Sequence, residues 1–406
     1  MARIVQKFGG TSVADLDRIK AAAELVKSEV QAGNEAVVVV SAMAGETNRL
    51  VELSLGISSL YDEGEYDAIV ASGEQVTAGL LSIALQEIGV SARSFQGWQI
   101  PIRTNAAHSK ARILTIEKEK LLQILSTGQV PVVAGFQGLS QENRITTLGR
   151  GGSDTSAVAL AAAIGADRCD IFTDVDGVYT SDPRIVSRAK KLSRITYEEM
   201  LELASLGAKV LQTRSVELAM KYNVRVQVRS SFANTEGTLV VNEGEIVEHE
   251  LVSGIAHSRE EAKITLIRVA DKPGIAAQIF GPLTNANINV DMIVQNVSED
   301  GNSTDLTFTV NRSDFDRALN VIEENKDLIG FERLTSDPGV AKISVVGVGM
   351  RSHAGVAQTM FNALAERGIN IQVISTSEIK VSILISDEYT ELALRSLHTA
   401  YGLDAP

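Results

Sequence analysis

The sequence predicts an α/β fold in which helices sandwich an open, mainly parallel sheet, followed by two small α+β domains. Up to about residue 245, short runs rich in β-branched residues alternate with longer runs of helical period, which is typical of a layered fold with a parallel sheet. The remaining third contains an internal repeat instead. The chain of 406 residues has room for two to four domains at roughly 100–200 residues each.

Strands are expected where apolar and β-branched residues run together, namely over Ile4–Phe8, Ala36–Val40, Asp67–Ala71, Val130–Gly135, Ile171–Thr173, Val224–Val228 and Thr238–Val241. Apolar residues at steps of three and four, with Gly33 behind them, predict a helix between the first two strands; they are Leu16, Ile19, Ala23, Val26 and Val30. Further helices are expected over Glu74–Ile88, Asp154–Ile164, Tyr197–Leu206 and Lys209–Tyr222.

The repeat becomes visible when Gly274 is placed over Gly355. The match then continues through Ala276 and Ala357, Phe280 and Phe361, Leu283 and Leu364, Ile288 and Ile369, and Asn289 and Asn370. Each copy shows a strand, a loop ending in glycine, an amphipathic helix, a turn and two further strands, the last being Asp305–Val310 or Lys380–Ile385. A small β-α-β-β domain is therefore expected twice.

These patterns divide the chain. The layered domain is expected over residues 1–245 and the repeat domains over 263–337 and 338–406. Residues 246–262 are polar and glutamate-rich, which indicates a linker.

Composition excludes several classes of protein. The formal net charge of -13 argues against nucleic acid or an anionic membrane as a main partner. Cys169 is the single cysteine, so no internal disulfide can form. The N-terminus lacks the zones of a signal peptide, and apolar runs such as Ala157–Ile164 are much shorter than the roughly 20 residues of a membrane span. We expect a soluble, cytoplasmic protein.

The first chemical motif is Lys7-Phe8-Gly9-Gly10-Thr11-Ser12, between a strand and a helix. Glycines let the backbone approach a ligand, the helix start presents N–H groups, and the lysine adds a positive charge. A phosphate-sized anion fits such a turn. The turn is not a Walker loop, because the chain has no GxxxxGK[ST] string. A plain Gly-Gly turn with an incidental lysine is the alternative.

The second motif, Thr147 to Ser156, reads TLGRGGSDTS and again places glycines, a cation and hydroxyls at a helix start. Ser153 or Asp154 could simply cap that helix, but a cap explains one of these residues and not their density. Two such turns predict a common site at the carboxyl edge of the sheet, where open α/β sheets bind ligands.

The third motif, Thr173 to Arg184, reads TDVDGVYTSDPR. Its acids lack the order of a calcium loop. It is either a surface loop or a nucleotide-contacting loop with Tyr179 beside a base and Arg184 near phosphates. Ser41, Thr47 and Glu74 are expected at the ends of the second and third strands, although each could be a cap or a solvated side chain. The five histidines are scattered without ligand spacing, so we interpret them as structural.

Together these segments resemble the aspartokinases of the amino-acid kinase superfamily over nearly the whole chain. The resemblance rests on KFGGTS, on VVVVSAMAGETN (37–48), ASGEQ (71–75), TTLGRGGSDTSA (146–157), FTDVDGVYTSDPR (172–184) and GAKVLQTRSVE (207–217). The repeats resemble tandem ACT domains, the regulatory modules of that family. The resemblance implies transfer of a phosphoryl group from MgATP to the side-chain carboxylate of L-aspartate, giving 4-phospho-L-aspartate on the route to lysine, threonine and methionine.

The resemblance also implies roles for residues. Lys7 and Lys209 would act on the phosphates, Asp154 would orient the lysines, and Gly9 and Gly10 would donate N–H groups. The remaining ATP contacts would be Ser41, Thr173, Asp174, Tyr179, Asp182 and Arg184. The aspartate contacts would be Arg150 on the α-carboxylate, Glu74 on the α-ammonium, and Thr47, Gly151, Gly152 and Ser153. No protein-only magnesium cage is visible, so Mg²⁺ is expected to rest on ATP oxygens and water, and no residue is assigned to a metal.

In ACT pairs, effector amino acids bind between a loop and a facing helix start. The matching positions are Asp271, Gly274, Ile275, Ala276, Gln295, Asn370, Ile371, Thr376, Ser377 and Glu378. The alternative is that these residues only form turns and strand edges. Lysine, alone or together with threonine, is the expected effector. Open sheet edges predict pairing of ACT domains in a homo-oligomer. By family analogy, a strand near Leu251–Ala256 belongs to the second ACT domain.

Two other functions are open to this sequence. A glutamate 5-kinase or uridylate kinase would share the fold, but the SAMAGETN segment and the tandem ACT tail speak against both. An inactive amino-acid sensor would be expected to lose the phosphate turns, yet Lys7, Arg150, Asp154 and Lys209 are present. A fused homoserine dehydrogenase is excluded by length. The sequence leaves the effector, the number of subunits and any separate regulatory subunit undecided.

Overall fold

A computed structural model describes residues 1–206, 210–246, 250–297, 303–353 and 355–404. The chain forms two compact units. The first comprises Met1–Val178, Lys191–Ser205 and Lys209–Val247, and the second comprises Tyr179–Lys190, Leu206–Ala208 and Glu248–Pro406. The short segment Tyr179–Lys190 therefore belongs to the second unit, although its neighbours on both sides belong to the first.

The first unit is built on an eight-stranded sheet in the order β10-β12-β11-β9-β1-β2-β6-β3. Its strands are β1 (Arg3–Phe8), β2 (Glu35–Val40), β3 (Ala92–Phe95), β6 (Val130–Ala134), β9 (Arg168–Thr173), β10 (Arg194–Thr196), β11 (Val226–Ser230) and β12 (Thr238–Val241). All neighbours pair in parallel except β11 and β12, which are antiparallel. The predicted open, mainly parallel sheet is confirmed.

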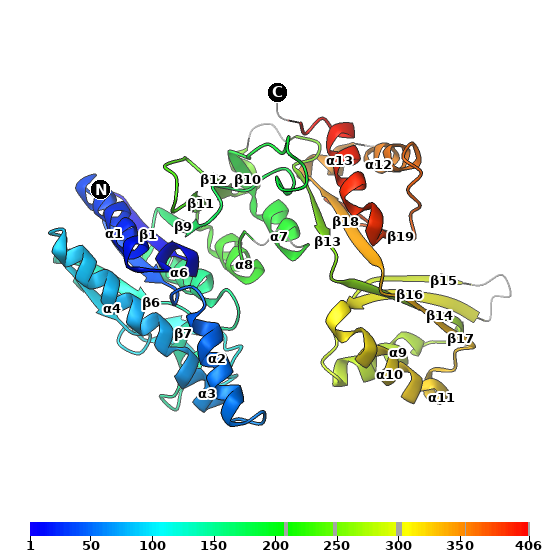
Figure 1. Ribbon diagram of the computed structural model, residues 1–406, viewed down its shortest axis with the longest axis horizontal. Coiled ribbons are helices and arrows are strands. Elements are labelled where there is room, and N and C mark those ends of the chain that lie inside the picture. Colours follow the sequence, from blue (N-terminus) through cyan, green and yellow to red (C-terminus); the bar gives the residue numbers. More distant parts are fainter. Residues whose placement is uncertain (207–209, 247–249, 298–302, 354, 405–406) are drawn as a thin grey trace. The chain divides into compact units, whose positions relative to one another are not determined.

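Helices cover both faces of this sheet (Figure 1). They are α1 (Leu16–Gln31), α2 (Glu46–Ile57), α3 (Glu63–Val70), α4 (Ser72–Glu87), α5 (Lys118–Ser126), α6 (Gly152–Ile164), α7 (Tyr197–Ser205) and α8 (Thr213–Tyr222). Helices α1 and α4 pack on one face, where Phe8, Val38 and Phe172 join Val26 and Leu81 in a buried core. Helix α6 contacts β1, β2 and β9 and packs against α8. A small sheet in the order β5-β4-β7-β8 completes the unit, with β4 (Ile102–Thr104), β5 (Ile113–Ile116), β7 (Gln137–Leu139) and β8 (Ile145–Thr147).

The strand predicted over Asp67–Ala71 is wrong, because these residues end helix α3 and lead into α4. The side chain of Asp62 accepts hydrogen bonds from the N–H groups of Gly64 and Glu65 and so caps α3. A short apolar run cannot distinguish a buried strand from a buried helix. The helix predicted from Lys209 begins at Thr213 instead, after the extended residue Gln212.

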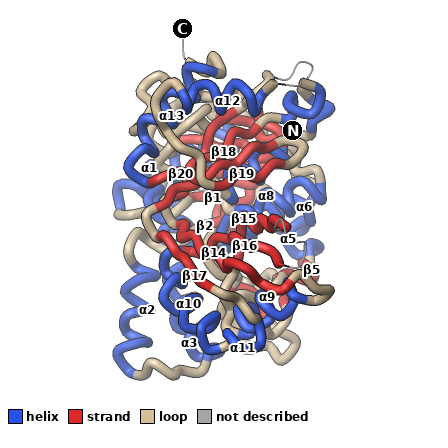
Figure 2. The backbone as a smooth tube through the Cα atoms, turned by 90° about the vertical axis from the view of Figure 1, so that its right-hand side faces the viewer, coloured by secondary structure: helices blue, strands red, loops and turns tan. Residues whose placement is uncertain are grey.

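The second unit holds two four-stranded sheets of matching layout, β15-β16-β14-β17 and β13-β18-β20-β19. The first repeat contains β14 (Glu261–Ala270), α9 (Ile275–Asn285), β15 (Val290–Val297), β16 (Ser303–Asn311), α10 (Phe315–Glu324), α11 (Lys326–Ile329) and β17 (Arg333–Asp337). The second contains β18 (Val340–Val346), α12 (Val356–Ala365), β19 (Val373–Thr376), β20 (Lys380–Ser386) and α13 (Thr390–Ala400). Figures 1 and 2 show α9 to α11 beside the first sheet, and α12 and α13 beside the second.

Strand β13 (Gly254–Ser258) pairs antiparallel with β18 along its whole length. It therefore belongs to the sheet of the second repeat, although the entire first repeat separates the two strands in the chain. The first repeat domain is thus an insertion into the second.

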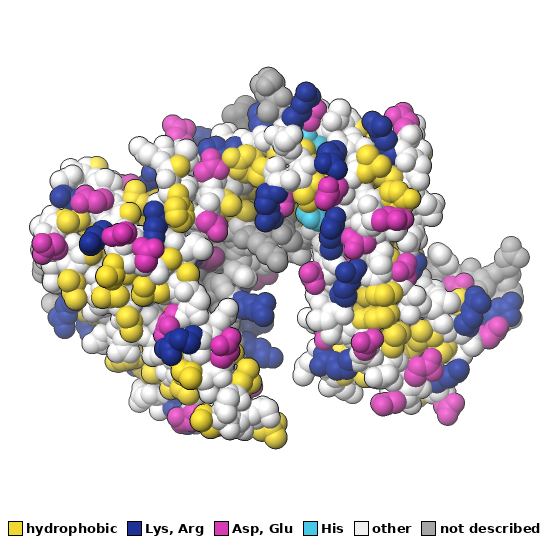
Figure 3. All heavy atoms as spheres, viewed as in Figure 1, with side chains coloured by type: hydrophobic (Ala, Val, Ile, Leu, Met, Phe, Trp, Pro, Cys, Tyr) yellow, Lys and Arg dark blue, Asp and Glu magenta, His cyan; other side chains and the backbone are white. Residues whose placement is uncertain are grey.

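The stretch Glu63–Glu87 is long and apolar enough to span a membrane by length and composition, but 50% of its apolar window is buried. Leu81 and Leu85 of this stretch belong to the core of the first unit. Basic and acidic side chains are interspersed on the face shown in Figure 3.

Candidate active site

The carboxyl ends of four strands meet at one edge of the large sheet. Backbone hydrogen bonds continue past the strand ends, from Gly9 N to Phe172 O at 3.1 Å, from Ser41 N to Phe8 O at 3.0 Å and from Gly135 N to Val40 O at 3.0 Å. These bonds bring the Gly-Gly turn and the start of the segment after β2 to one place.

A buried ion pair lies at this edge. The Nζ atom of Lys7, near the end of β1, is 2.6 Å from Oδ1 of Asp154, in the first turn of α6, and both side chains are about one-tenth exposed. Lys7 faces α6 because its neighbours Gln6 and Phe8 point to the opposite face of the strand. The pair joins the first two motifs, which are far apart in the chain. Lys209, the other predicted lysine, lies outside the described residues.

The glycines of the first turn leave little room for a side chain. A Cβ atom on Gly9 would lie 3.3 Å from Lys7 Nζ and 3.4 Å from Phe172 O, and one on Gly10 would lie 3.1 Å from Ala42 O. The turn residues Gly10–Val13 form a 3-10 turn with Ser12 buried and hydrogen-bonded to Phe172 O. Backbone N–H groups can therefore approach a ligand next to the Lys7 ammonium.

Glu74 supplies a buried carboxylate nearby. It stands in the first turn of α4 and is only 3% exposed. Its Oε1 accepts a hydrogen bond of 3.1 Å from Ala42 N, whereas Oε2 has no hydrogen-bond partner among the described residues. Burial raises the pKa of Glu74 to about 7, against the lowering effect of the Ala42 hydrogen bond. A buried, half-satisfied carboxylate is well suited to receive an ammonium group.

Glu74 and Thr47 are not at strand ends as predicted. Both stand in first turns of helices, Thr47 in α2 and Glu74 in α4. Ser41 does follow a strand, directly behind β2, and is half-buried like Thr47. The error has the same cause as the false strand over Asp67–Ala71.

The loop that carries Arg150 is held rigidly at both sides. Gly149 and Gly151 adopt left-handed conformations with φ of 79° and 65°. Ahead of them, the fully buried carboxylate of Asp67 accepts hydrogen bonds from Thr147 Oγ1 at 2.6 Å and Thr147 N at 3.0 Å. The guanidinium of Arg214 on α8 donates to Leu148 O at 3.0 Å. Arg150 itself is exposed, and its loop leads directly into α6, where Gly152, Ser153 and Asp154 are buried.

Sequence reasoning missed Asp67 and Arg214. Asp67 also accepts hydrogen bonds from Ser109 N and His108 Nδ1, and Arg214 also donates to Ala111 O. The acids Asp62, Glu63 and Glu65 ahead of Asp67 were a usable signal for a helix start. No local signal identified the partners of either residue, because they lie far away in the chain.

The third motif is divided between the two units. Thr173 is the last residue of β9 in the first unit and Asp174 follows it, and the Thr173 hydroxyl donates to Asp174 Oδ1 at 3.1 Å. Tyr179, Asp182 and Arg184 belong to the second unit. Arg184 is paired with Asp182 through three hydrogen bonds, which lower the pKa of that carboxyl.

No group of three or more His, Cys, Asp or Glu side chains suited to a metal ion occurs in the described ranges. The oxygens of Thr173 and Asp174 are of the kind that Mg²⁺ takes alongside phosphate oxygens and water. Two such oxygens fit an ion that takes most of its ligands from elsewhere.

The predicted effector residues fall into two groups in the second unit. Asp271, Gly274, Ile275 and Ala276 surround the start of α9, where Gly274 has a φ of 91°, and Gln295 is on β15. Asn370, Ile371, Thr376, Ser377 and Glu378 lie around β19. Most of these side chains are exposed, while Ile275 is buried in the core of the first repeat. No hydrogen bond between the two groups was found for the residues that the structure describes.

Comparison with known proteins agrees with this architecture. Residues 2–230 match the amino acid kinase family, and residues 263–327 and 343–401 each match an ACT domain. An aspartate kinase from Pseudomonas putida is 56% identical, with 100% of this chain and 99% of that protein covered. Aspartokinase III of E. coli, in complex with aspartate and ADP, superposes with a TM-score of 0.83 at 29% identity over 98% of this chain and 99% of that one. The same enzyme with lysine and aspartate gives 0.80, also at 29% identity, with 98% of both chains covered.

Proposed function

The chain belongs to the aspartokinase family and is an aspartate kinase with two ACT domains, and we propose that it transfers the γ-phosphoryl group of ATP to the side-chain carboxylate of L-aspartate, giving 4-phospho-L-aspartate. The observation that carries this proposal is the buried Lys7–Asp154 pair beside the Gly9-Gly10 turn, at the same sheet edge as the buried carboxylate of Glu74.

Phosphoryl transfer between two anionic oxygens requires mainly positive charge and alignment. Lys7 supplies an ammonium that Asp154 holds in place, and Gly10 is proposed to present its N–H group to the transferring phosphoryl group. The N–H of Gly9, predicted to do the same, already donates to Phe172 O. Lys209 is proposed to hold the ATP phosphates from the segment before α8. Ser41, Thr173, Asp174, Tyr179, Asp182 and Arg184 are proposed to complete the nucleotide contacts.

L-aspartate is proposed to bind with its α-ammonium at Glu74 and its α-carboxylate at Arg150. The free Oε2 atom of Glu74 supports the first contact, because an incoming ammonium would satisfy it. The guanidinium of Arg150 can bind a planar carboxylate in bidentate fashion. Thr47, Gly151, Gly152 and Ser153 are proposed to line the rest of this pocket. The reactive side-chain carboxylate would then face the phosphoryl group beside Lys7.

Mg²⁺ is proposed to enter with ATP, held mainly by phosphate oxygens and water. When bound, it would neutralise charge on the transferring group. Thr173 and Asp174 at the end of β9 are the residues proposed to touch its shell. Neither residue is proposed to take part in the transfer itself.

Lysine, alone or with threonine, is proposed to inhibit through the ACT domains, and the product is proposed to feed the route to these amino acids and methionine. The lysine complex of the E. coli relative supports this choice. Pairing of ACT sheet edges between chains is proposed to make the protein a homo-oligomer, and the cytoplasm is its proposed location.

The test measures ADP release from ATP with L-aspartate, L-glutamate and uridylate as separate acceptors. We expect release that depends on aspartate, and a hydroxylamine trap should capture the acyl phosphate as the aspartyl hydroxamate. Preference for glutamate or uridylate, or ADP release without a trapped acyl phosphate, would contradict the proposal.

A further inference from the structure

The segment Tyr179–Lys190 is anchored in the second unit, not in the sheet that precedes it. Its side chains Ile185, Val186 and Ala189 pack into the core of the second ACT domain beside Val252 and Ile255. Ala189 also forms an isolated antiparallel bridge with Asp404. Ile255 N donates to Thr180 O at 2.7 Å. The segment therefore packs and hydrogen-bonds as part of the second ACT domain.

Thr180 is the centre of this anchor and is 1% exposed. Its N–H donates to Lys190 O at 2.9 Å, and its Oγ1 accepts from Lys190 N at 2.9 Å, which closes the segment into a loop. The same Oγ1 lies 2.8 Å from Nε2 of His398, a fully buried residue on α13. The backbone and side chain of Thr180 thus fix the loop to the domain.

His398 is oriented in turn by Asp404, whose Oδ1 lies 2.9 Å from Nδ1. An ionised carboxylate can only accept, so Nδ1 carries a proton, and in the neutral ring Nε2 accepts the hydrogen of the Thr180 hydroxyl. Thr399 Oγ1 donates to the other oxygen of Asp404 at 3.2 Å. Every polar atom of the chain Asp404–His398–Thr180 then has a partner, which makes the arrangement specific.

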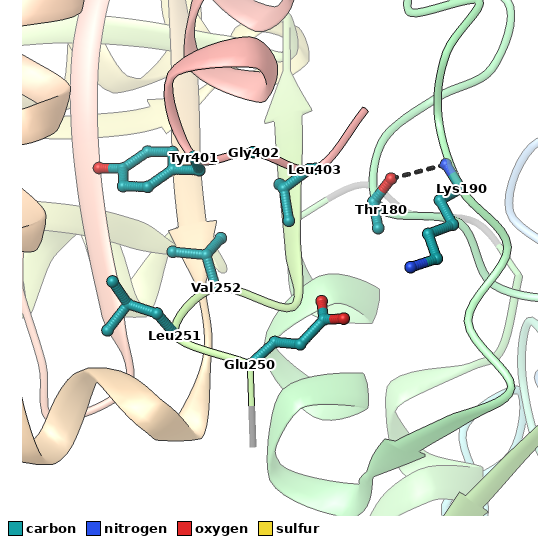
Figure 4. Close-up of a pocket in the computed structure, with 8 residues that line it drawn as sticks. All are labelled: Thr180, Lys190, Glu250, Leu251, Val252, Tyr401, Gly402 and Leu403. Carbon is teal, nitrogen blue, oxygen red and sulfur yellow. Dashed lines mark hydrogen bonds between the residues drawn. The ribbon is translucent and has the colours of Figure 1, made fainter. Parts of the chain in front are cut away.

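On its other side Thr180 lines an open pocket of about 260 Å³. Figure 4 shows Lys190 and Glu250 extending along this space and Leu403 across it, with the Thr180–Lys190 bond drawn. Packing does not hold the loop from this side. The hydrogen bonds to His398 and β13 hold Thr180, whereas Ile185, Val186 and Ala189 hold the other part of the segment by packing into the core.

We infer that His398 and Asp404 of the second ACT domain are positioning residues for nucleotide binding, acting through Thr180 on the loop that carries Tyr179, Asp182 and Arg184. This inference rests on the proposed function, in which those three residues contact ATP. It assigns the C-terminal helix of the regulatory domain a part in nucleotide affinity. Neither His398 nor Asp404 touches the reacting groups.

The test compares Thr180→Val, which removes the hydroxyl, with Thr180→Ser, which keeps it. Ser344→Ala is the matched control, because it breaks the buried 2.7 Å Ser344–Ser382 bond of the same domain without touching the loop. Loss of the anchor should raise the KM for ATP about five- to tenfold, the weight of one or two hydrogen bonds. The KM for aspartate should stay within about twofold. Thr180→Ser should restore the ATP value, and Ser344→Ala should leave it unchanged.

Two further measurements distinguish failure of this inference from failure of the proposed function. Calorimetric binding of MgADP needs no turnover, so absent aspartate-dependent ADP release in the unaltered protein would count against the proposed function alone. Trypsin should cut faster after the exposed Arg184 and Arg188 in Thr180→Val than in Ser344→Ala. An MgADP affinity in Thr180→Val equal to that of the unaltered protein would overturn the inference, as would equal losses in Ser344→Ala.

If Thr180→Val does not fold, His398→Asn replaces it. The asparagine amide stands where Nδ1 was and keeps the bond to Asp404, but it does not reach Thr180. The same selective loss of MgADP affinity is expected, and an unchanged affinity would again overturn the inference.

Discussion

At the residue scale, Glu74 is a buried carboxylate in the first turn of α4 that is proposed to receive the α-ammonium of aspartate. Its carboxylate is 3% exposed and holds one backbone N–H, which leaves one oxygen for a ligand. Burial of a charged group without a full set of partners is costly, so the ionised form is less favourable than in water, and a cation beside it would stabilise it. The raised pKa of about 7 follows from that burial.

The pH dependence of aspartate use follows directly. Glu74 is protonated below its pKa of about 7 and then cannot pair with an ammonium, so kcat/KM for aspartate should fall as the pH drops, approaching about tenfold per unit. Profiles of kcat/KM from pH 5.5 to 8.5 measure this. Glu74→Gln should be weakly active with no break near 7; an unchanged break in that variant would assign it to another group.

Lys7 is the second residue whose proposed role can be tested, in this case by its effect on kcat. Lys7→Ala should lower kcat by a factor of about 10³, because a fixed positive charge at the transferring group is lost. Lys20→Ala, an exposed lysine on α1, is the control and should be fully active. Because Lys7→Ala leaves Asp154 unpaired, Lys7→Met combined with Asp154→Asn separates lost stability from lost catalysis. Near-normal turnover in a folded Lys7 variant would remove the assignment.

At the scale of elements, the glycine-rich turn before α6 is held by structures that are distant in sequence. Asp67 on α3 accepts two hydrogen bonds from Thr147, and Arg214 on α8 donates a hydrogen bond to the Leu148 carbonyl. Left-handed Gly149 and Gly151 then reverse the chain so that α6 begins at Gly152. A fixed turn of this kind can hold Arg150 in one place although its side chain is exposed.

Substitution of Arg150 tests its proposed contact with the α-carboxylate of aspartate. Arg150→Lys keeps the charge but loses the fork, so the KM for aspartate should rise about tenfold while the KM for ATP stays unchanged. Arg144→Lys is the control, because Arg144 lies in the neighbouring β7–β8 hairpin and is paired with Glu65 of α3. Initial rates against both substrates measure the effect. Normal aspartate kinetics in Arg150→Lys would exclude the clamp role.

At the scale of the whole molecule, two interleavings matter. The first ACT domain is inserted between β13 and β18 of the second, and the segment Tyr179–Lys190 is inserted from the catalytic part into the ACT part. Along the sequence, the second unit is therefore interrupted by segments of the first, and the second ACT domain is interrupted by the first ACT domain. The segment that is proposed to contact the nucleotide is therefore part of the same unit as the ACT domains.

Effector binding should appear at this scale. Lysine is expected to lower the initial rate and to raise the melting temperature of the protein, with threonine adding to the effect, because a ligand of the folded state stabilises it. Asp271→Ala and Glu378→Ala should both lose this response while the rate without effector is unchanged. The measurement is a titration of each amino acid alone and together. Indifference of the unaltered protein to both would contradict the proposed regulation.

Patterns along the chain were enough for the parallel sheet, the ACT repeats and the glycine-rich turns, because strand and helix periods and turn residues are local properties. The glycine-rich motifs contain Lys7 and Asp154, which the structure brings together as an ion pair, although the role of Asp154 was given by the family resemblance. The patterns failed at α3, where a run of apolar residues fits a strand or a helix equally, and so misplaced Glu74. The contacts Asp67–Thr147, Arg214–Leu148 and Thr180–His398 could not be predicted, since each joins residues more than 65 positions apart. Such pairs are decided by packing of distant elements, which no local pattern encodes.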